Sequence, residues 1–587
     1  MKQNRNIFRA AWIATALFVT ACGLDKDSGQ PESAASAGPS AVLFNLDGPL
    51  PEFSGPEEMF TPDAQNQYDL LKLMRKAVYD LNVQEIVVHI GAPTLSLARA
   101  SEVVAALKQI TAAGKPLTCH FDAADNVGYF IAAAGCPKIL MSPAGTVEAL
   151  GLAAEPLFLR EFLAGLGISA DMLHIGRYKD AAEPMMRDSM SEESREALDA
   201  LLKELHRIFK DGIATGRKLS PEKVQTLIDG GPYDAKESLT AKLVDDIRPL
   251  SAFLGELRTK YAGGVDAEYG KTPPKQMSFS ELIKIFGAAE PKKEQPKQDH
   301  IALVPVVGEI MSGESNDFMG GSDNVHDMSL IRTLDELKDD DSVKAVVLRI
   351  DSPGGSALAS DNIWHAVRAL GTKKPVIASM GDVAASGGYY IASAATEVFS
   401  IPATITGSIG VVGGKIVFSE AANKWGITPE RLQTGTRAAL GSPFSRFSDE
   451  ERIALTRMMQ SAYDMFIDRV TEGRGLERAK VLEVAEGRVW TGTQAKEFGL
   501  VTRMGSLDDA VNRAREAAEV PAGTPVEIVP KPKNLMDLLG EAFSEPQASA
   551  ALRVAKRIPE IEEALTMTDL LMEQRVLAVL PWVIRVH

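Results

Sequence analysis

The sequence predicts an α/β protein made of two tandem copies of one domain. Short β-branched runs alternate with amphipathic helical patterns, which is typical of a largely parallel sheet flanked by helices. The same succession of patterns occurs twice, and Ile301 in the second copy stands 260 residues after Ala41 in the first. A chain of 587 residues is also too long for one hydrophobic core, so two or more domains are expected.

Matched runs define the two copies. The apolar run at 41–46 corresponds to the run at 301–306, and the run at 86–90 corresponds to 346–350. The correspondence continues through 381–395, where Gly, Tyr and Ile recur at the spacing found in the first copy. We expect a first domain at 41–270, a connection at 271–299, a second domain at 300–530 and a C-terminal extension at 531–587.

The second copy shows the expected elements most clearly. The patterns predict an amphipathic helix at 330–338, a buried strand at 343–350 and a second amphipathic helix at 360–370. The apolar run 375–380 predicts another buried strand, and the small residues of 389–395 predict a tightly packed helix after it. The C-terminal extension has no counterpart in the first copy, and its pattern predicts helices.

The chain begins with a pattern typical of an export signal. Residues 1–9 carry three basic and no acidic side chains, residues 10–20 are apolar, and Cys22 follows Thr-Ala. The apolar run is too short to span a membrane comfortably, and the cysteine resembles the lipidated residue of a bacterial lipobox. We expect a lipoprotein-type signal peptide at 1–22, lipidation of Cys22 and a flexible tether at 23–40. An uncleaved N-terminal anchor is the alternative, and either form holds the exported protein at a membrane.

Composition excludes some partners and sites. The net charge of −16 argues against a nucleic-acid partner, because such a partner needs a basic face. None of the eight histidines has a metal-ligand spacing, so we expect no metal site. The two cysteines after the signal, Cys119 and Cys136, could pair, but we expect two buried free thiols.

The segment 381–391 contains the first candidate for catalysis. Ser386 follows an apolar strand and precedes Gly387 and Gly388, at a turn where a helix is expected to begin. Backbone N–H groups at such a turn are unpaired and the helix dipole favours negative charge, which suits an oxyanion on a substrate carbonyl. The same residues are also typical of a helix N-cap serine with glycines in a tight turn.

The two copies differ in a complementary way. Ser386 of the second copy stands opposite Asn126, and the glycines at 354–355 stand opposite Thr-Leu in the first copy. Lys179 of the first copy stands opposite Ala438 in the second. One copy therefore keeps a serine and a glycine turn, whereas the other keeps an amine.

These complementary residues predict one hydrolytic site. A serine hydroxyl needs a base, and the Lys179 amine can serve if burial keeps it neutral. Gly354 and Gly355 would follow a strand and allow a backbone N–H to point at a ligand, with the N–H of Ser386 or Gly387 as a second oxyanion donor. Taken alone, Lys179 has the usual interpretation of a solvated loop lysine.

Four motifs together resemble a known family. They are Gly-Arg-Tyr-Lys-Asp-Ala-Ala-Glu-Pro at 176–184, Asp-Ser-Pro-Gly-Gly-Ser at 351–356, Gly-Asp-Val-Ala-Ala-Ser-Gly-Gly-Tyr-Tyr at 381–390, and Thr-Gly-Ser-Ile-Gly-Val at 406–411. The set closely resembles signal peptide peptidase A, also called protease IV, in its long tandem-repeat form. The resemblance covers roughly 41–530 and implies tandem domains similar to ClpP and the crotonases.

The resemblance also implies roles for individual residues. Ser386 would be the nucleophile and Lys179 the general base of a Ser–Lys dyad. Ser408 matches a serine that helps to orient the lysine in this family. Gly355 would donate to the oxyanion from the Pro-Gly-Gly turn, and no metal or cofactor is required.

The function implied is that of a membrane-associated serine endopeptidase that cleaves apolar peptides such as signal peptide remnants. The family forms homo-oligomers, with a tetramer as the expectation, and faces the periplasmic side of the bacterial cell envelope. A lipid on Cys22 would differ from the plain membrane-spanning anchor that is usual in the family.

Two other classes of function compete with this hypothesis. A crotonase-type acyl-thioester enzyme would keep the glycine donors, but it would need neither Ser386 nor an export signal. A non-catalytic envelope scaffold of the same fold would not need to keep Ser386, Lys179 and the glycine pair intact. The sequence therefore favours the peptidase.

Overall fold

The computed structural model describes residues 38–53, 65–270, 298–314, 324–530 and 577–579. Cys22, the predicted signal peptide and most of the predicted tether and connection lie outside these residues. Within the described part of the chain, no helix combines the length and the apolar character needed to cross a lipid bilayer.

The first half of the chain forms a sheet with the strand order β6-β4-β3-β2-β1-β8, and β7 also pairs with β4. Its four long strands are parallel, so a crossover has to connect each strand to the next. Helices α2, α3 and α4 provide these crossovers. The strands are β1 (Ser40–Pro49), β2 (Val83–Thr94), β3 (Leu117–Ala124), β4 (Ile139–Val147), β6 (Tyr233–Asp234), β7 (Asp246–Ile247) and β8 (Val265–Asp266). The helices that cover them include α2 (Gln67–Tyr79), α3 (Leu97–Ala112), α4 (Asn126–Gly135) and α7 (Glu192–Arg217).

The second half forms a sheet with the strand order β18-β16-β14-β12-β9-β20, and β15 pairs with both β14 and β19. The strands are β9 (His300–Val307), β12 (Val343–Ser352), β14 (Val376–Ala385), β15 (Glu397–Ser400), β16 (Ile405–Gly407), β18 (Val489–Thr491), β19 (Arg503–Met504) and β20 (Val526–Ile528). The helices include α12 (Asp327–Asp339), α13 (Ala357–Gly371), α14 (Gly387–Ala392), α16 (Asp449–Arg474) and α19 (Leu507–Ala517).

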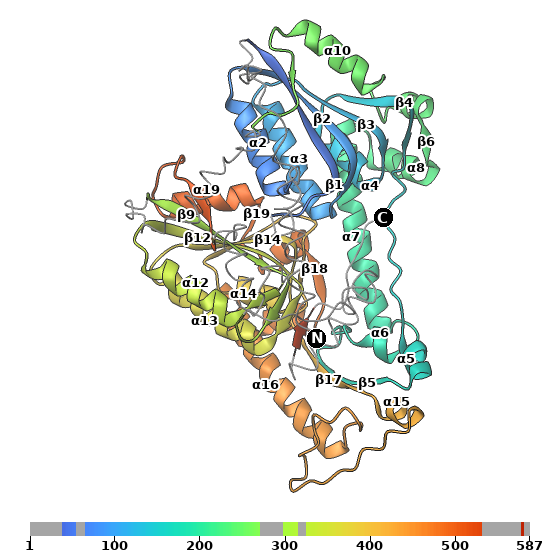
Figure 1. Cartoon of the computed structure of the whole chain (residues 1–587), viewed down its shortest axis with the longest axis vertical. Coiled ribbons are helices and arrows are strands. Elements are labelled where there is room, and N and C mark those ends of the chain that lie inside the picture. The colour runs from blue at the N-terminus through green and yellow to red at the C-terminus, as the bar shows by residue number, and fades with distance from the viewer. Residues whose placement is uncertain (1–37, 54–64, 271–297, 315–323, 531–576, 580–587) are drawn as a thin grey trace, which may run out of the picture.

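The two sheets repeat one topology, as the internal repeat predicted. Strands β9, β12 and β14 take the places of β1, β2 and β3, and the helices between them correspond in the same way. In Figure 1 the first sheet lies at the top in blue and the second lies below it. The helices and strands expected in the second copy are present, although α14 begins at Gly387, earlier than the predicted helix.

Burial explains why these segments adopt their structures. The near-continuous apolar run of β12 is buried along most of its length, because helices cover both faces of a parallel sheet. Helix α13 begins after Ser356, whose side chain accepts a hydrogen bond from the backbone N–H of Ala359. The helix then buries Ile363, Val367 and Leu370 along one face.

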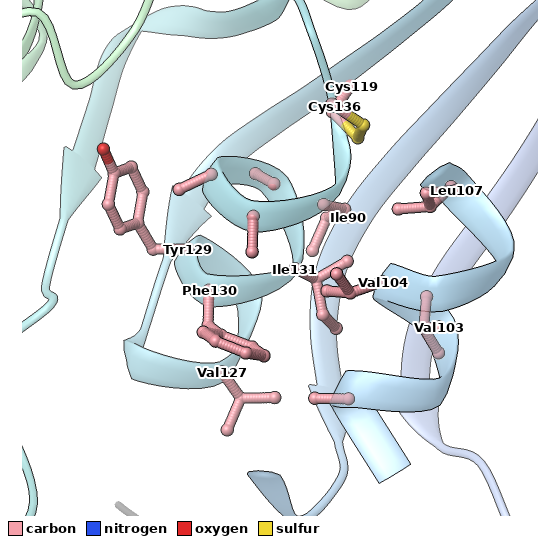
Figure 2. Packing of buried hydrophobic residues seen from close by; sticks show 14 of the residues in the cluster. Ile90, Val103, Val104, Leu107, Cys119, Val127, Tyr129, Phe130, Ile131 and Cys136 are labelled. Atoms are coloured by element: carbon pink, nitrogen blue, oxygen red, sulfur yellow. A yellow bond between two sulfur atoms is a disulfide. The ribbon is translucent and has the colours of Figure 1, made fainter. Parts of the chain in front are cut away.

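The core of the first half contains a disulfide that corrects the sequence prediction. Helix α4 packs against α3 there, with Ile131 close to Val104 (Figure 2). Cys119 in β3 and Cys136 at the end of α4 are bonded, and their Cα atoms lie 5.9 Å apart. The expectation of two free thiols was wrong because a crossover helix runs back along its strand, so the end of α4 lies beside the start of β3.

A third sheet joins the two halves, with the strand order β11-β10-β13-β21-β17-β5. Strand β5 comes from the first half and pairs antiparallel with β17 of the second, from Ile175 opposite Val411 to Ser169 opposite Val417. The chain that leaves β5 is thereby placed beside the second half. The strands of this sheet are β5 (Ser169–Ile175), β10 (Glu309–Met311), β11 (Asn324–His326), β13 (Gly354–Ser356), β17 (Val411–Val417) and β21 (Leu577–Val579).

The C-terminal extension differs from the prediction where the structure describes it. Residues 577–579 form the strand β21 rather than a helix, because they pair with β13 and β17. The rest of the extension, for which helices were predicted, lies outside the described residues.

Candidate active site

Ser386 lies at the turn between β14 and α14. Its φ and ψ angles are 53° and −114°, a combination that residues other than glycine rarely adopt. Its N–H donates to the carbonyl of Gly407 at 2.8 Å, and its own carbonyl accepts from the N–H of Tyr390 at 2.8 Å. An N-cap serine normally has an extended backbone and accepts a helix N–H, but the Ser386 side chain makes no capping bond. Ser386 therefore occupies the N-cap position of α14, but its hydroxyl does not cap the helix.

Gly387 and Gly388 allow the turn at Ser386 to pack closely on the segment that contains the glycines at 354–355. A Cβ atom at Gly387 would lie 2.6 Å from Ser360 Oγ and 3.2 Å from the backbone N of Gly355. A Cβ atom at Gly388 would lie 2.7 Å from the carbonyl oxygen of Ser352. These distances are too short for any side chain, so glycine is required for the two motifs to meet.

Lys179 reaches the same place from the first half of the chain. It follows β5 through a turn at Gly176, whose φ of 106° favours glycine. The N–H of Tyr178 donates to the carbonyl of Glu486 at 2.7 Å, which fixes this turn on the second half. Gly487 lies so close that a Cβ atom there would be 2.5 Å from the backbone N of Lys179.

The structure brings Lys179, Ser386 and Ser408 together. Lys179 Nζ donates to Ser386 Oγ at 2.8 Å, to Ser408 Oγ at 2.9 Å and to the Ser408 carbonyl at 3.0 Å. The turn that contains Ser408 is held by a bond from its N–H to the carbonyl of Arg488 at 2.8 Å. With three acceptors around it, the amine is fixed in position against the serine hydroxyl.

The electrostatic environment favours a neutral amine. Lys179 is 1% exposed, and both serines are fully buried. Burial lowers the pKa of Lys179 from 10.5 to about 7, because the charged form loses its hydration, and the nearby Asp180 carboxylate opposes this shift only in part. Burial also raises the pKa of Asp180 to about 6. A lysine with such a pKa can accept a proton near neutral pH.

Hydrogen bonds discriminate among the predicted oxyanion donors. The N–H of Gly354 donates to Ser352 Oγ at 3.2 Å, and the N–H of Ser386 is engaged by Gly407. Gly355 and Gly387 remain as candidates, and they lie close together, because a Cβ atom at Gly387 would be 3.2 Å from the backbone N of Gly355. The N–H of Gly387 also belongs to the first turn of α14, where the helix dipole favours negative charge.

The family model for peptidase family S49 matches this chain twice, at residues 109–261 and 368–521. The chain belongs to peptidase family S49. The two matches fall in the two halves that the sequence predicted, and the Clp protease model matches residues 313–406 of this S49 peptidase. The predictions of tandem ClpP-like domains and of a serine peptidase are confirmed.

Curated relatives agree with this membership. "Serine protease SPPA, chloroplastic" from Arabidopsis thaliana is 30% identical over 84% of this chain and 72% of that protein. "Protease 4" from Salmonella typhi is 32% identical over 77% of this chain and 72% of that protein. "Protease 4" from Haemophilus influenzae is 29% identical over 85% of this chain and 82% of that protein. A ClpP1 mutant from Listeria monocytogenes aligns at 16% identity with a TM-score of 0.24, over 36% of this chain and 94% of that one, and this score supports no comparison of geometry.

The sequence reasoning missed a buried ion network between the two halves of this S49 peptidase. Arg349 in β12 is fully buried and donates to Glu52 at 2.6 Å and to Glu102 at 2.9 Å, both in the first half. Asp382 in β14 also bonds to Ser96 of the first half. A single arginine within an apolar strand was the signal that could have predicted this network. A buried charge requires partners, so acidic residues were to be expected near it. Among the described residues, no cluster of His, Cys, Asp or Glu side chains could hold a metal ion.

Proposed function

We propose that this S49 peptidase is an endopeptidase in which Ser386 is the nucleophile and Lys179 the general base. The observation that carries the proposal is the 2.8 Å contact between Lys179 Nζ and Ser386 Oγ, which are 207 residues apart and come from different repeats. The lowered pKa of Lys179 supports it, since a general base must be partly neutral at the working pH.

Acylation follows from this geometry. Lys179 Nζ takes the proton of Ser386 Oγ as that oxygen attacks the carbonyl carbon of the scissile peptide bond. The oxyanion that forms faces the N–H groups of Gly355 and Gly387, and one such donor contributes about 3 kcal/mol to stabilising the transition state. The C–N bond then breaks, the leaving amine takes the proton from Lys179, and the acyl group stays on Ser386 as an ester.

Deacylation uses the same groups in reverse. A water molecule attacks the ester carbonyl and gives a proton to Lys179, which returns it to Ser386 Oγ as the C–O bond breaks. The products are a free carboxylic acid and the original serine. Ser408 keeps the amine in place during both steps, since its hydroxyl and its carbonyl both accept from Lys179 Nζ.

The proposal extends to substrates and location. Apolar peptides such as signal peptide remnants would be cleaved at the periplasmic face of a bacterial envelope, by a protein held at the membrane through lipidated Cys22. The basic and apolar start of the sequence supports export. The disulfide between Cys119 and Cys136 supports an oxidising compartment, because disulfides persist there and are rare in the cytosol.

Self-association into a homo-oligomer is also proposed, and the cross-pairing of β5 with β17 supports it. Helix α5 (Arg160–Leu166) of the first half is equivalent to helix α15 (Ser419–Lys424) of the second. Strand β5 follows its helix and β17 precedes its helix, so β5 and β17 are not equivalent strands of the two repeats. The counterpart of β17 in the first half is 151–157, and the counterpart of β5 in the second half is 428–434. Neither forms a strand in the described chain, and we propose that the two segments pair between subunits.

Exposed apolar side chains lie on or near the second of these segments. Trp425, Ile427 and Leu432 are 83%, 58% and 99% exposed. Large apolar side chains exposed together favour a partner surface. Analytical ultracentrifugation of the wild type and of Leu432→Asp tests this part of the proposal: the wild type should be oligomeric and the variant should dissociate. A wild-type monomer would contradict it.

The catalytic proposal is tested with full-length wild type, Ser386→Ala and Lys179→Ala. Matched controls are Ser393→Ala, another fully buried serine, and Lys415→Ala, another largely buried lysine. Fluorophosphonate labelling and hydrolysis of apolar peptides are measured across pH. The wild type and both controls should label and hydrolyse, whereas each dyad variant should lose roughly 10⁴-fold in kcat.

Two results would overturn the proposal in different ways. If Lys179→Ala keeps its turnover, the base is another residue and the pairing of the two repeats is wrong. If the wild type neither labels nor hydrolyses peptides, the non-catalytic scaffold replaces the peptidase as the function of this chain.

A further inference from the structure

Strand β14 has a bulge just before the turn that contains Ser386. Its pairing with β12 slips between Ile350 and Ser352, so that the three residues 381–383 of β14 stand opposite Asp351 alone. A bulge bends its strand, and next to an active site it commonly re-aims a side chain. The position of Ser386 therefore depends on what holds this bulge in place.

The bulge aligns β14 with β16, the strand that leads to Ser408. Beyond the bulge, Ala385 pairs with Gly407, and the N–H of Ser386 donates to the carbonyl of Gly407 at 2.8 Å. Ser386 and Ser408 are thereby brought to the same amine, since Lys179 Nζ donates to both hydroxyls. A shift of the bulge would misalign Ser386 with the amine that is proposed to activate it.

Asp351 holds the bulge from the side of β12. Its carboxylate accepts a hydrogen bond from the N–H of Val383 at 3.0 Å. A Cβ atom at Gly381 would lie 3.1 Å from Asp351 Cγ, so the bulge packs directly against this carboxyl group. Within the second half, one side chain therefore contacts both ends of the bulge.

Asp382, the middle residue of the bulge, binds the first half of the chain. Its carboxyl group accepts a hydrogen bond from the hydroxyl of Ser96. Ser96 is the N-cap of α3, and its oxygen accepts from the N–H of Arg99 at 3.1 Å, which fixes its own position. The first half, which contains Lys179, is thus bonded to the bulge that precedes Ser386.

The first copy of the repeat has a different arrangement at the equivalent positions. Asp122 stands opposite Asp382, but its carboxylate accepts from Ser142 of its own half. Gly91 stands opposite Asp351, so the first copy has no second carboxyl group there. Of the two copies, only the one with the nucleophile has the pair of carboxyl groups, as expected if the pair serves the nucleophile turn.

The Asp382 carboxyl group belongs to a cluster in which acidic groups outnumber basic ones. The other members of the cluster are Asp351, Glu52, Glu102, Arg99 and Arg349. Burial, and then repulsion from the Asp351 carboxylate, raise the pKa of Asp382 to about 8. The neutral form is therefore favoured near neutral pH, and asparagine resembles that form in both charge and shape.

We propose that Asp382 is a positioning residue that transmits the docking of the first half to the nucleophile turn. Its bond to Ser96 fixes the bulge, and the fixed bulge sets Ser386 against Lys179. This inference rests on the proposed function of the Ser386–Lys179 dyad. Docking of the two halves and alignment of the nucleophile are then one event, so a chain whose halves are undocked has no aligned nucleophile.

The test uses full-length variants on both sides of this contact. Asp382→Ala removes the acceptor, and Ser96→Gly removes the hydroxyl, while glycine still serves as an N-cap for α3 at little cost. Asp382→Asn keeps an acceptor and is the conservative variant. Asp122→Ala, at the equivalent position of the first copy, is the matched control. The measurements are kcat and KM for apolar peptides, and hydrogen exchange of the segment 383–392 followed by mass spectrometry.

Asp382→Ala and Ser96→Gly should each lower kcat about tenfold and leave KM unchanged, because the contact aligns the nucleophile and does not bind the peptide. The double variant should be no worse than either single variant, since both changes remove the same contact. Amides of 383–392 should exchange about tenfold faster in these variants. Asp382→Asn and Asp122→Ala should match the wild type in kcat and in exchange.

Three results would overturn the inference. They are an unchanged kcat in Asp382→Ala, effects that multiply in the double variant, and a loss in Asp382→Asn as large as that in Asp382→Ala. If Asp382→Ala does not fold, the comparison of Ser96→Gly with Asp382→Asn takes its place, and equal kcat values in these two would also refute the role of Asp382.

The exchange readout separates the two proposals. If the wild type hydrolyses peptides but Asp382→Ala and Ser96→Gly match it in kcat and in exchange, the dyad stands and the positioning role is refuted. If exchange rises only in these two variants but the wild type neither labels nor hydrolyses, Asp382 stands as the support of the turn and the catalytic proposal fails.

Discussion

Replacing Lys179 by methionine removes an amine that the fold buries almost completely. The side chain is 1% exposed, and burial lowers its pKa from 10.5 to about 7. Each pKa unit corresponds to 1.36 kcal/mol. When Lys179 is protonated in both the folded and the unfolded chain, its burial therefore lowers the free energy of unfolding by about 5 kcal/mol relative to an exposed lysine. Methionine has a similar length and no charge, so Lys179→Met should be more stable than the wild type at neutral pH and inactive at every pH.

The sign of the pH dependence follows from proton binding. Below pH 7 the lysine is protonated in both the folded and the unfolded chain, and the full cost is present. Between pH 7 and 10.5 the unfolded chain keeps a proton that the folded chain has lost, so the stability of the wild type rises with pH. The advantage of Lys179→Met should therefore shrink by about 1.4 kcal/mol for each pH unit across this window.

The assay is the midpoint of thermal unfolding of both proteins at several values between pH 6 and pH 10. Lys203→Met is the control, because Lys203 is exposed on α7 and its loss should produce no such trend. Peptidase activity of the wild type should rise with pH, with half of the maximum near pH 7. A stability difference that stays constant across the pH range would show that Lys179 keeps its proton in the folded protein, and the general-base role would be refuted.

Three further predictions concern residues around the dyad and the core. Ser408→Ala removes one of the three acceptors around the Lys179 amine, so kcat should fall about tenfold while KM stays unchanged. An equal change in kcat and in KM would indicate a general loss of structure. Gly355→Ala should abolish activity and lower the unfolding midpoint, because its Cβ would lie 2.1 Å from a carbonyl oxygen of β10; an active variant would contradict this packing. Replacing Cys119 and Cys136 together by alanine should lower the free energy of unfolding by about 3 kcal/mol in denaturant titrations, and unchanged stability would indicate free thiols in the wild type.

Much of the site was predictable because the repeat compares the chain with itself. Ser386 and the glycines of 354–355 stand out where the first copy has other residues, and so does Lys179 where the second copy has alanine. Local patterns also predicted the strand and helix on either side of Ser386. These features depend on residue type and spacing along the chain, which a sequence shows directly.

The sequence by itself determined the α/β class, the duplication and the identity of the residues that the proposed chemistry needs. Only the tertiary structure decided that Lys179 meets Ser386 within one chain, because that contact depends on the antiparallel pairing of β5 with β17. The disulfide, the partners of Arg349 and the placement of β21 beside β13 were likewise decided by the tertiary structure. The physical reason is that each depends on contacts between segments far apart in the chain, and strand pairing uses backbone groups that every residue has.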